Sequence, residues 1–107
     1  MISTHVLDLN LGSPAQGIAV RLEKQTGQNW ALISESQTNA DGRIVFACPA
    51  EAGTFRLDFR IESYFTKLKM TPFFTEAQVV FRIADTGRKY HVPLLLSPFG
   101  YSTYRGS

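Results

Sequence analysis

The chain has 107 residues, of which 44% are hydrophobic and 12% aromatic, and its net charge is +2 with both histidines neutral. This length fits one domain, residues 1–107, and the apolar fraction is enough for a hydrophobic core of β-structure. The eleven basic residues are scattered, which argues against nucleic-acid binding, and no run of eighteen apolar residues predicts a membrane span.

Short strands separated by turn signals are predicted over most of the chain. Alternation is clearest in residues 53–61, where Phe55, Leu57 and Phe59 share one face and charged residues occupy the other. Turns are predicted at residues 12–17, 26–29 and 39–42. Strands are predicted at residues 2–9, 18–24, 30–34, 44–46, 53–61, 78–83, 90–96 and 101–105.

One helix of about two turns is predicted between the fifth and sixth of these strands, at residues 62–70. Ser63 can act as its N-cap, Phe65 and Leu68 fall at helical spacing, and Pro72 ends it. Eight or so short strands with one short helix in a chain of this size predict a sandwich or a barrel.

The strand at residues 91–96 is apolar on both of its faces. One face can pack on the core of the domain, but a small sandwich has no third layer to cover the other. The first strand poses the same problem, because Leu7 and Leu9 lie beside His5 while Val6 points the opposite way. We therefore expect oligomerisation through the sheet that carries these two strands.

The two histidines of the chain, His5 and His91, fall on the predicted interface faces by strand parity. Histidine can take and return a proton near neutral pH, so either residue could act as a base; both could also be structural interface residues. Arg43 follows the turn at 39–42. Its planar donor fork suits the oxygens of a flat ring, although a solvated turn arginine is the commoner case.

The last residues form a predicted strand rich in hydrogen-bonding groups. Tyr104 can hydrogen-bond a ligand, and Arg105 and the carboxylate of Ser107 can orient Tyr104 or the histidines. We expect this tail to be ordered and to belong to a site; the alternative is a last strand that only closes a sheet.

Other chemistry has little support. Cys48 has no motif around it and reads as a buried, inert thiol, and Ser97 and Ser102 lack a nucleophile elbow. Asp8 shares a face with Val6 and not with His5, so no third metal ligand joins the histidines and no metal or cofactor is predicted. A single cysteine and a start without a leader-like segment favour the cytoplasm.

Three blocks of sequence resemble one known family. They are YRGS at 104–107 after HVPLLLSP at 91–98, STHVLD at 3–8 followed by GSPA at 12–15, and TNADGR at 38–43. They resemble the 5-hydroxyisourate hydrolases, the transthyretin-related enzymes of purine catabolism, over essentially the whole chain. One departure is FFTE at 73–76, where FFPE is expected.

The resemblance implies an all-β, transthyretin-like sandwich of two four-stranded sheets with one short helix, assembled as a homotetramer with the site at the subunit interface. It implies cofactor-free hydrolysis of 5-hydroxyisourate at N1–C6, with one of His5 and His91 as the base. Arg43 would hold the ring oxygens, and Tyr104, Arg105 and Ser107 would shape the pocket. The alternative that it leaves open is a carrier of a small ligand of the thyroid-hormone type.

Overall fold

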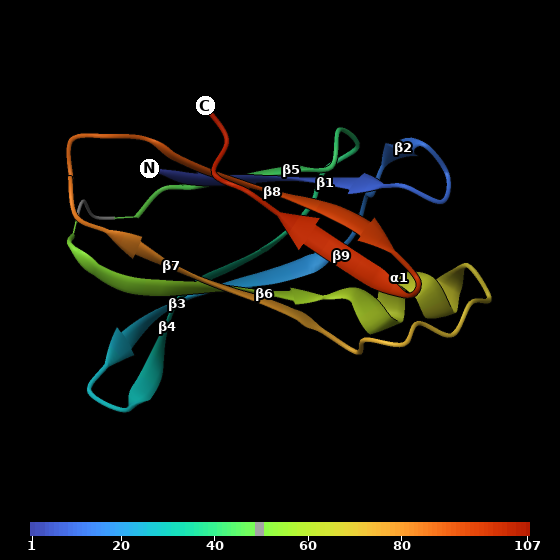
Figure 1. The fold of residues 1–107 in the computed structure, drawn as a ribbon, viewed down its shortest axis with the longest axis horizontal. Helices are drawn as coiled ribbons and strands as arrows, with labels where there is room; N and C mark the ends of the chain where they lie inside the picture. Colours follow the sequence, from blue (N-terminus) through green and yellow to red (C-terminus); the bar gives the residue numbers. More distant parts are fainter. Residues whose placement is uncertain (49–50) are drawn as a thin grey trace.

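Two β-sheets pack face to face in the computed structural model, which describes residues 1–48 and 51–107 (Figure 1). The first sheet contains β1 (Ile2–Asp8), β2 (Ser13–Pro14), β5 (Arg43–Phe46), β8 (Tyr90–Ser97) and β9 (Gly100–Thr103). The second contains β3 (Ala19–Thr26), β4 (Asn29–Gln37), β6 (Gly53–Arg60) and β7 (Ala77–Ile83). The predicted all-β sandwich is thereby confirmed.

The first sheet has five strands where four were predicted. Its order is β2-β1-β8-β9, and β5 pairs with β1 on the same side as β2. The extra strand β2 lies in the predicted turn at 12–17 and consists of two residues that pair with Leu7 and Asp8. The second sheet has the predicted four strands, in the order β4-β3-β6-β7.

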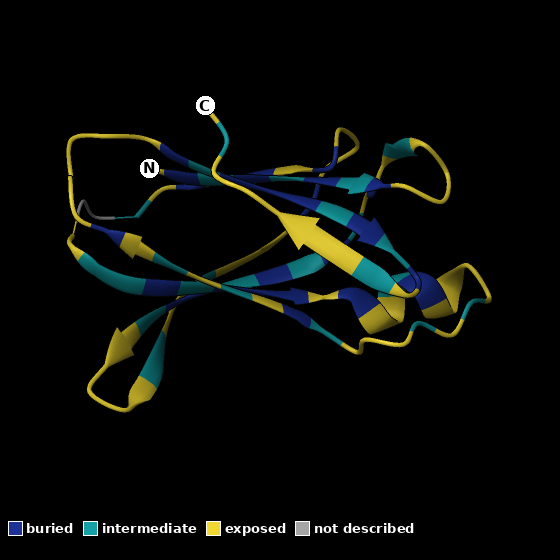
Figure 2. Ribbon diagram, in the orientation of Figure 1, coloured by how far each residue is buried: buried dark blue, intermediate teal, exposed yellow. Residues whose placement is uncertain are grey.

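The core lies between the two sheets, and buried residues recur along the strands of both sheets (Figure 2). Alternation along each strand decides which residues enter it: in β1, Ile2, Thr4, Val6 and Asp8 are buried and the residues between them are half-buried. The largest fully buried side chains are Phe46, Phe59, Phe65, Ile2, Ile18, Leu22, Leu57, Ile61, Leu94, Leu96, Val6 and Val20.

The helix α1 (Ile61–Lys67) follows β6 directly and lies at one end of the sandwich (Figure 1). Its N-cap is Arg60, without a side-chain cap, and Ser63 lies inside the helix, so the predicted capping role of Ser63 was wrong. Ile61 and Phe65 are one helical turn apart and both are buried, so core packing sets the start of the helix. The helix ends well before Pro72, and Lys69 has a left-handed φ of 60°.

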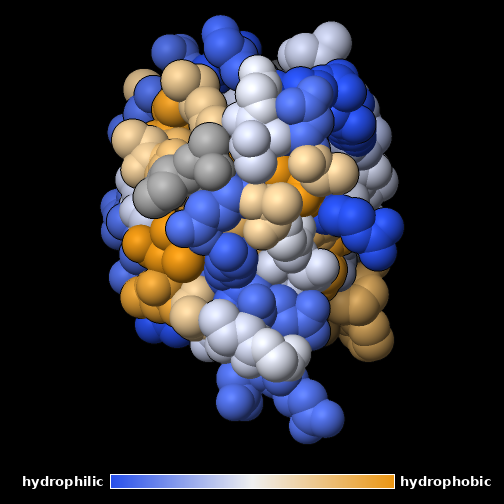
Figure 3. Space-filling view, turned by 90° about the vertical axis from the view of Figure 1, so that its left-hand side faces the viewer, coloured by the Kyte–Doolittle hydropathy of each residue, from blue (hydrophilic) through white to orange (hydrophobic). Residues whose placement is uncertain are grey.

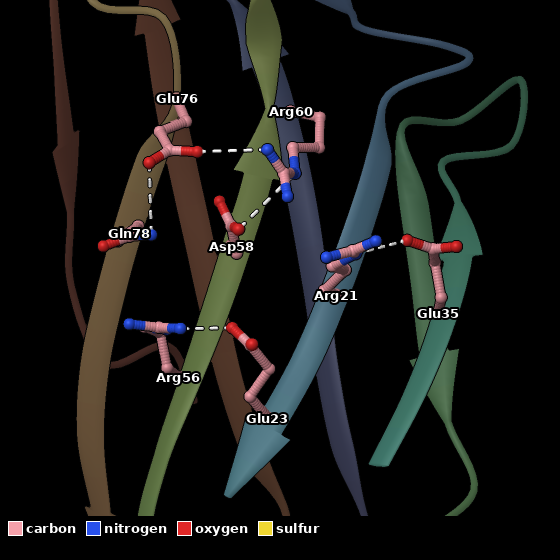
Figure 4. Close-up of polar contacts among 8 residues, drawn as sticks. All are labelled: Arg21, Glu23, Glu35, Arg56, Asp58, Arg60, Glu76 and Gln78. Carbon is pink, nitrogen blue, oxygen red and sulfur yellow. Dashed lines mark hydrogen bonds and ion pairs between the residues drawn. The ribbon is translucent and has the colours of Figure 1, made fainter. Parts of the chain in front are cut away.

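The outer face of the second sheet is covered by ion pairs (Figure 4). Arg21 bonds Glu35 at 2.7 Å and Arg56 bonds Glu23 at 2.8 Å. Arg60 lies 3.4 Å from Asp58 and 3.2 Å from Glu76, and Arg56 stacks 4.3 Å from the ring centroid of Trp30. The side chains of Arg21, Glu35, Arg60 and Glu76 are exposed to solvent on this face, whereas those of Glu23 and Asp58 are buried beneath their partners.

At the end of the sandwich at the left of Figure 1, the hydrophobic areas of the described residues are separated by hydrophilic side chains (Figure 3). Among residues 1–48 and 51–107, no helix is long and apolar enough to cross a membrane. The outer face of the first sheet carries both histidines. It is therefore the surface on which a functional site is expected.

Candidate active site

Strand register brings His5 and Arg43 together. In the antiparallel pair β1·β5, His5 lies directly opposite Arg43, and directly opposite residues project from the same face of a sheet. His5 is half-buried and Arg43 is exposed, whereas Thr4 and Ile44 beside them point into the core. Both predicted residues therefore lie on the outer face of the first sheet.

A tight turn fixes the start of β5 and with it Arg43. The side chain of Asn39 accepts hydrogen bonds from the backbone N–H groups of Asp41, at 2.9 Å, and Arg43, at 3.0 Å. Gly42 has a φ of 72°, and its carbonyl accepts a bond from Val6 N–H at 2.8 Å. A Cβ on Gly42 would lie 2.5 Å from the carbonyl oxygen of Val6, so this position requires glycine.

His91 joins the same face from the other side of β1. The strands β1 and β8 run parallel, and Ser3 pairs with His91 in their register. The Oγ of Ser3 lies 2.9 Å from Nδ1 of His91. Ser3 was missed in the sequence, although it lies two residues before His5 and so shares its face by parity.

The tail returns to cover His91. The strand β9 ends at Thr103, and Gly106 then forms an isolated bridge in which its N–H donates to the carbonyl of His91 at 2.8 Å. A Cβ on Gly106 would lie 2.5 Å from Cδ2 of the imidazole and 3.3 Å from Cγ of Pro93. The glycine backbone therefore rests directly against the ring, another contact that the sequence did not predict.

The environment of His91 favours the neutral imidazole. Burial lowers its pKa most, the positive charge of Arg43 and the neighbouring His5 lower it further, and a hydrogen bond with the backbone of Ser3 opposes them. A neutral imidazole at pH 7 can accept a proton, which an imidazolium cannot.

A cavity of about 250 Å³ opens beside these residues, and Ser3, Arg43, Lys89, His91 and Ser107 contribute to its lining. His5 is next to it through its register with Arg43. Of the predicted site residues, Arg43, His91 and Ser107 thus line one cavity, and His5 lies beside it.

Tyr104 and Arg105 lie around a second cavity of about 250 Å³, with Phe81 and Tyr90, and His91 borders both cavities. The guanidinium of Arg105 lies 5.1 Å from the ring centroid of Tyr90, a cation–π geometry. The tail therefore divides: Ser107 lines the cavity beside Arg43, and Tyr104 and Arg105 line its neighbour.

Asp8 faces away from His5, as predicted. Its carboxylate is fully buried on the core side and accepts bonds from the N–H groups of Asn10 and Leu11 and from the hydroxyl of Tyr64, at 2.6 Å. Burial, and then this bond to Asp8, raise the pKa of Tyr64. Within the described residues, no group of three His, Cys, Asp or Glu side chains gathers as a metal site. Cys48 is half-buried and packs against the core.

Comparisons with known proteins agree over nearly the whole chain. The model of the HIUase/Transthyretin family matches residues 2–106. The 5-hydroxyisourate hydrolase of Salmonella typhimurium is 44% identical over 110 residues, covering 100% of this chain and 81% of the relative. That of Mus musculus is 42% identical over 111 residues, covering 99% and 94%.

Two solved structures share the fold closely. The 5-hydroxyisourate hydrolase of Klebsiella pneumoniae superposes with a TM-score of 0.87 and 38% identity, covering 99% of this chain and 98% of that one. Sea bream transthyretin in complex with thyroxine superposes with a TM-score of 0.91 and 33% identity, covering 98% and 93%.

Proposed function

The chain belongs to the HIUase/Transthyretin family, and from this premise we propose that it is an enzyme that hydrolyses 5-hydroxyisourate in urate degradation. Water adds at C6 and the N1–C6 bond breaks, which gives 2-oxo-4-hydroxy-4-carboxy-5-ureidoimidazoline. The observation that carries the proposal at the level of the site is the grouping of His5, Arg43 and His91 on one sheet face.

The chemistry needs a base and a cation. The attacking water must lose a proton while the C6 carbonyl oxygen gains negative charge, and N1 must take up a proton as it leaves. A neutral imidazole of His5 or His91 accepts the proton of water and returns it to N1. The guanidinium of Arg43 holds and polarises the ring oxygens. Neither a cofactor nor a covalent intermediate is required by this sequence of steps.

The tail completes the pocket in this proposal. Ser107 lines the cavity beside Arg43, while Tyr104 and Arg105 narrow the neighbouring space that His91 also borders. Their role is to shape the pocket and bind substrate, and the proton transfers belong to the histidines.

We further propose a homotetramer whose subunits meet through the outer face of the first sheet. Support comes from Leu7 and Leu95, which lie on that face beside the histidines and are only half-buried in one chain. A partner on this face would cover these side chains and enclose the open cavity. The single cysteine, Cys48, fits a reducing compartment such as the cytoplasm.

The alternative function is a carrier of a small aromatic ligand, because a transthyretin that binds thyroxine has the same fold. Hydrolysis is favoured over this alternative because the site is polar, with the side chains of His5, Arg43 and His91. A carrier of an aromatic ligand is better served by an apolar channel.

The discriminating experiment follows the ultraviolet absorbance of freshly generated 5-hydroxyisourate, beside a thyroxine titration. We expect turnover by the wild-type protein and a loss of about a hundredfold or more in His5→Ala and in His91→Ala. Arg43→Gln should also lose activity, whereas Arg21→Gln, on the solvated face of the other sheet, should not. Wild-type protein that binds thyroxine and leaves 5-hydroxyisourate untouched would refute the enzyme.

A further inference from the structure

The imidazole of His91 is held from two directions. The Oγ of Ser3 approaches Nδ1 to 2.9 Å across the parallel pair β1·β8, and the backbone of Gly106 packs against Cδ2. Ser3 is half-buried and His91 lines the cavity that also contains Arg43 and Lys89. With Nδ1 occupied by Ser3, Nε2 is the ring nitrogen left for a ligand in that cavity.

We propose that Ser3 is a positioning residue that fixes the tautomer of His91: Nδ1–H donates to Ser3 Oγ, and Nε2 carries the free lone pair. The inference rests on the proposed function for the catalytic role of His91, but the tautomer is a property of the free protein. Which nitrogen of a histidine is protonated follows from the hydrogen bond that the other nitrogen makes.

The charges around the ring decide the direction of this bond. The titratable and polar groups that lie near His91 or share its cavities include His5 from β1, Arg43 from β5, Arg82 from β7, Lys89 just before β8, and Tyr104, Arg105 and Ser107 from the tail. Arg43 and Lys89 are positive and line the same cavity as His91; Ser107, which carries the terminal carboxylate, lines it too, so two cations outweigh one anion there. A lone pair directed among cations is favourable, whereas an N–H dipole directed there is repelled.

The hydroxyl of Ser3 is suited to this role because it can accept as well as donate. If Ser3 accepts from Nδ1–H, its own proton turns to solvent, which a half-buried hydroxyl can reach. The result is an imidazole whose basic nitrogen is already exposed to the cavity before substrate binds. Loss of the hydroxyl removes the side-chain partner that favours the proton on Nδ1.

The test is nitrogen NMR of the uniformly labelled full chain at pH 8, with His91 identified by comparison with His5→Ala. We expect the wild-type spectrum to show His91 protonated at Nδ1. Ser3→Ala should shift the signals toward a mixture of tautomers and lower kcat about tenfold with little change in KM. Ser3→Thr should recover both the spectrum and most of the rate. Ser36→Ala, at an exposed position of β4, is the matched control and should match the wild type.

Two results would overturn the proposal: a wild-type His91 protonated at Nε2, or a Ser3→Ala protein with the wild-type spectrum and rate. The wild-type spectrum alone decides the tautomer, so the test does not depend on the folding of a variant. Absence of hydrolysis by wild-type protein with His91 protonated at Nδ1 would count against the proposed function and leave the role of Ser3 in the tautomer intact.

Discussion

Arg43 acts on His91 through its charge, and the effect can be measured on the ring itself. The two side chains share the outer face of the first sheet, and the guanidinium lowers the pKa of His91. We predict that Arg43→Gln raises the pKa of His91, because a like charge that opposes protonation is removed. The pKa should stay below the ordinary 6.5, since burial is the larger cause. Proton NMR titration of the His91 ring measures this, and a fall in pKa would contradict the assignment.

With His91 as the base of the proposed mechanism, the same residues set the pH dependence of the reaction. A lowered pKa keeps His91 neutral down to a pH below 6.5, so the acidic limb of kcat/KM should lie below that value. In Arg43→Gln the limb should move to higher pH as the overall rate falls. Arg21→Gln removes an equal charge from the other sheet and should leave the limb in place.

Asp58 is the least satisfied polar side chain in the described part of the chain. It is 3% exposed, its Oδ1 has no hydrogen-bond partner among the described residues, and burial raises its pKa despite the nearby Arg60. A carboxyl whose folded pKa lies above its unfolded pKa costs stability once the pH exceeds the folded value, and costs nothing below the unfolded value.

We therefore predict that Asp58→Asn raises the melting temperature at pH 7 and that the gain disappears as the pH falls toward 4. Glu35→Gln changes an exposed carboxylate of the same face and should have little effect at either pH. Calorimetry at the two pH values tests this. A wild-type protein more stable than Asp58→Asn at pH 7 would show that the contact with Arg60 outweighs the cost of burial.

Parity along strands predicted which face carries His5 and His91, because a strand alternates its side chains regardless of tertiary context. It did not identify Ser3 as the partner of His91, since the register between β1 and β8 joins residues 88 positions apart. Parity also could not predict that Ser107 and Arg105 line different cavities. The backbone leaves the strand after Thr103, and alternation has no meaning beyond that point.

At the scale of elements, the turn before β5 holds Arg43 in place. Gly42 combines a left-handed φ with a close approach to the Val6 carbonyl, whereas Gly27 in the β3–β4 turn has a φ of 66° and open space around it. Gly27→Ala should cost about 1 kcal/mol of unfolding free energy through backbone strain alone. Gly42→Ala should cost roughly 3 kcal/mol, because strain and steric overlap add.

Denaturant unfolding of the two variants measures the difference, and the activity of Gly42→Ala should fall as Arg43 moves with its strand. Equal destabilisation by the two substitutions would mean that β5 shifts freely to admit the methyl group. The site would then tolerate movement at Arg43.

Strand positions were predictable where alternation is long, as in β6, and the hairpin turn before β4 was predictable from its glycine. The strand β2 was not, because two residues carry no periodicity. The start of α1 was not predictable either. The polar Ser63 favours an N-cap at its own position, but the burial of Ile61 and Phe65 sets the start of the helix at Ile61. Tertiary packing overrides local preference at the start of the helix.

At the scale of the whole molecule, the outer face of the first sheet predicts assembly. Leu95 lies there, half-buried, between Pro93 and Ser97. Leu95→Glu should convert the proposed tetramers to dimers or monomers and abolish hydrolysis, because desolvating a charge in an apolar contact is costly. Leu32→Glu places the same charge at a side chain that is 56% exposed on the other sheet and should leave assembly intact. Analytical ultracentrifugation distinguishes the two, and an active Leu95→Glu monomer would contradict both the interface and a shared site.

The parallel pairing of β1 with β8 has a consequence for synthesis on the ribosome. The strand that carries Ser3 and His5 emerges first, and its partner with His91 emerges some 88 residues later. Until then β1 can pair only with β2 and β5, which occupy one of its edges, and the edge that later pairs with β8 remains unpaired. Such long-range pairing raises the contact order and slows folding, so the nascent chain depends on this edge staying free of other strands. The grouping of His5 with His91 therefore has to wait for β8 to pair with β1.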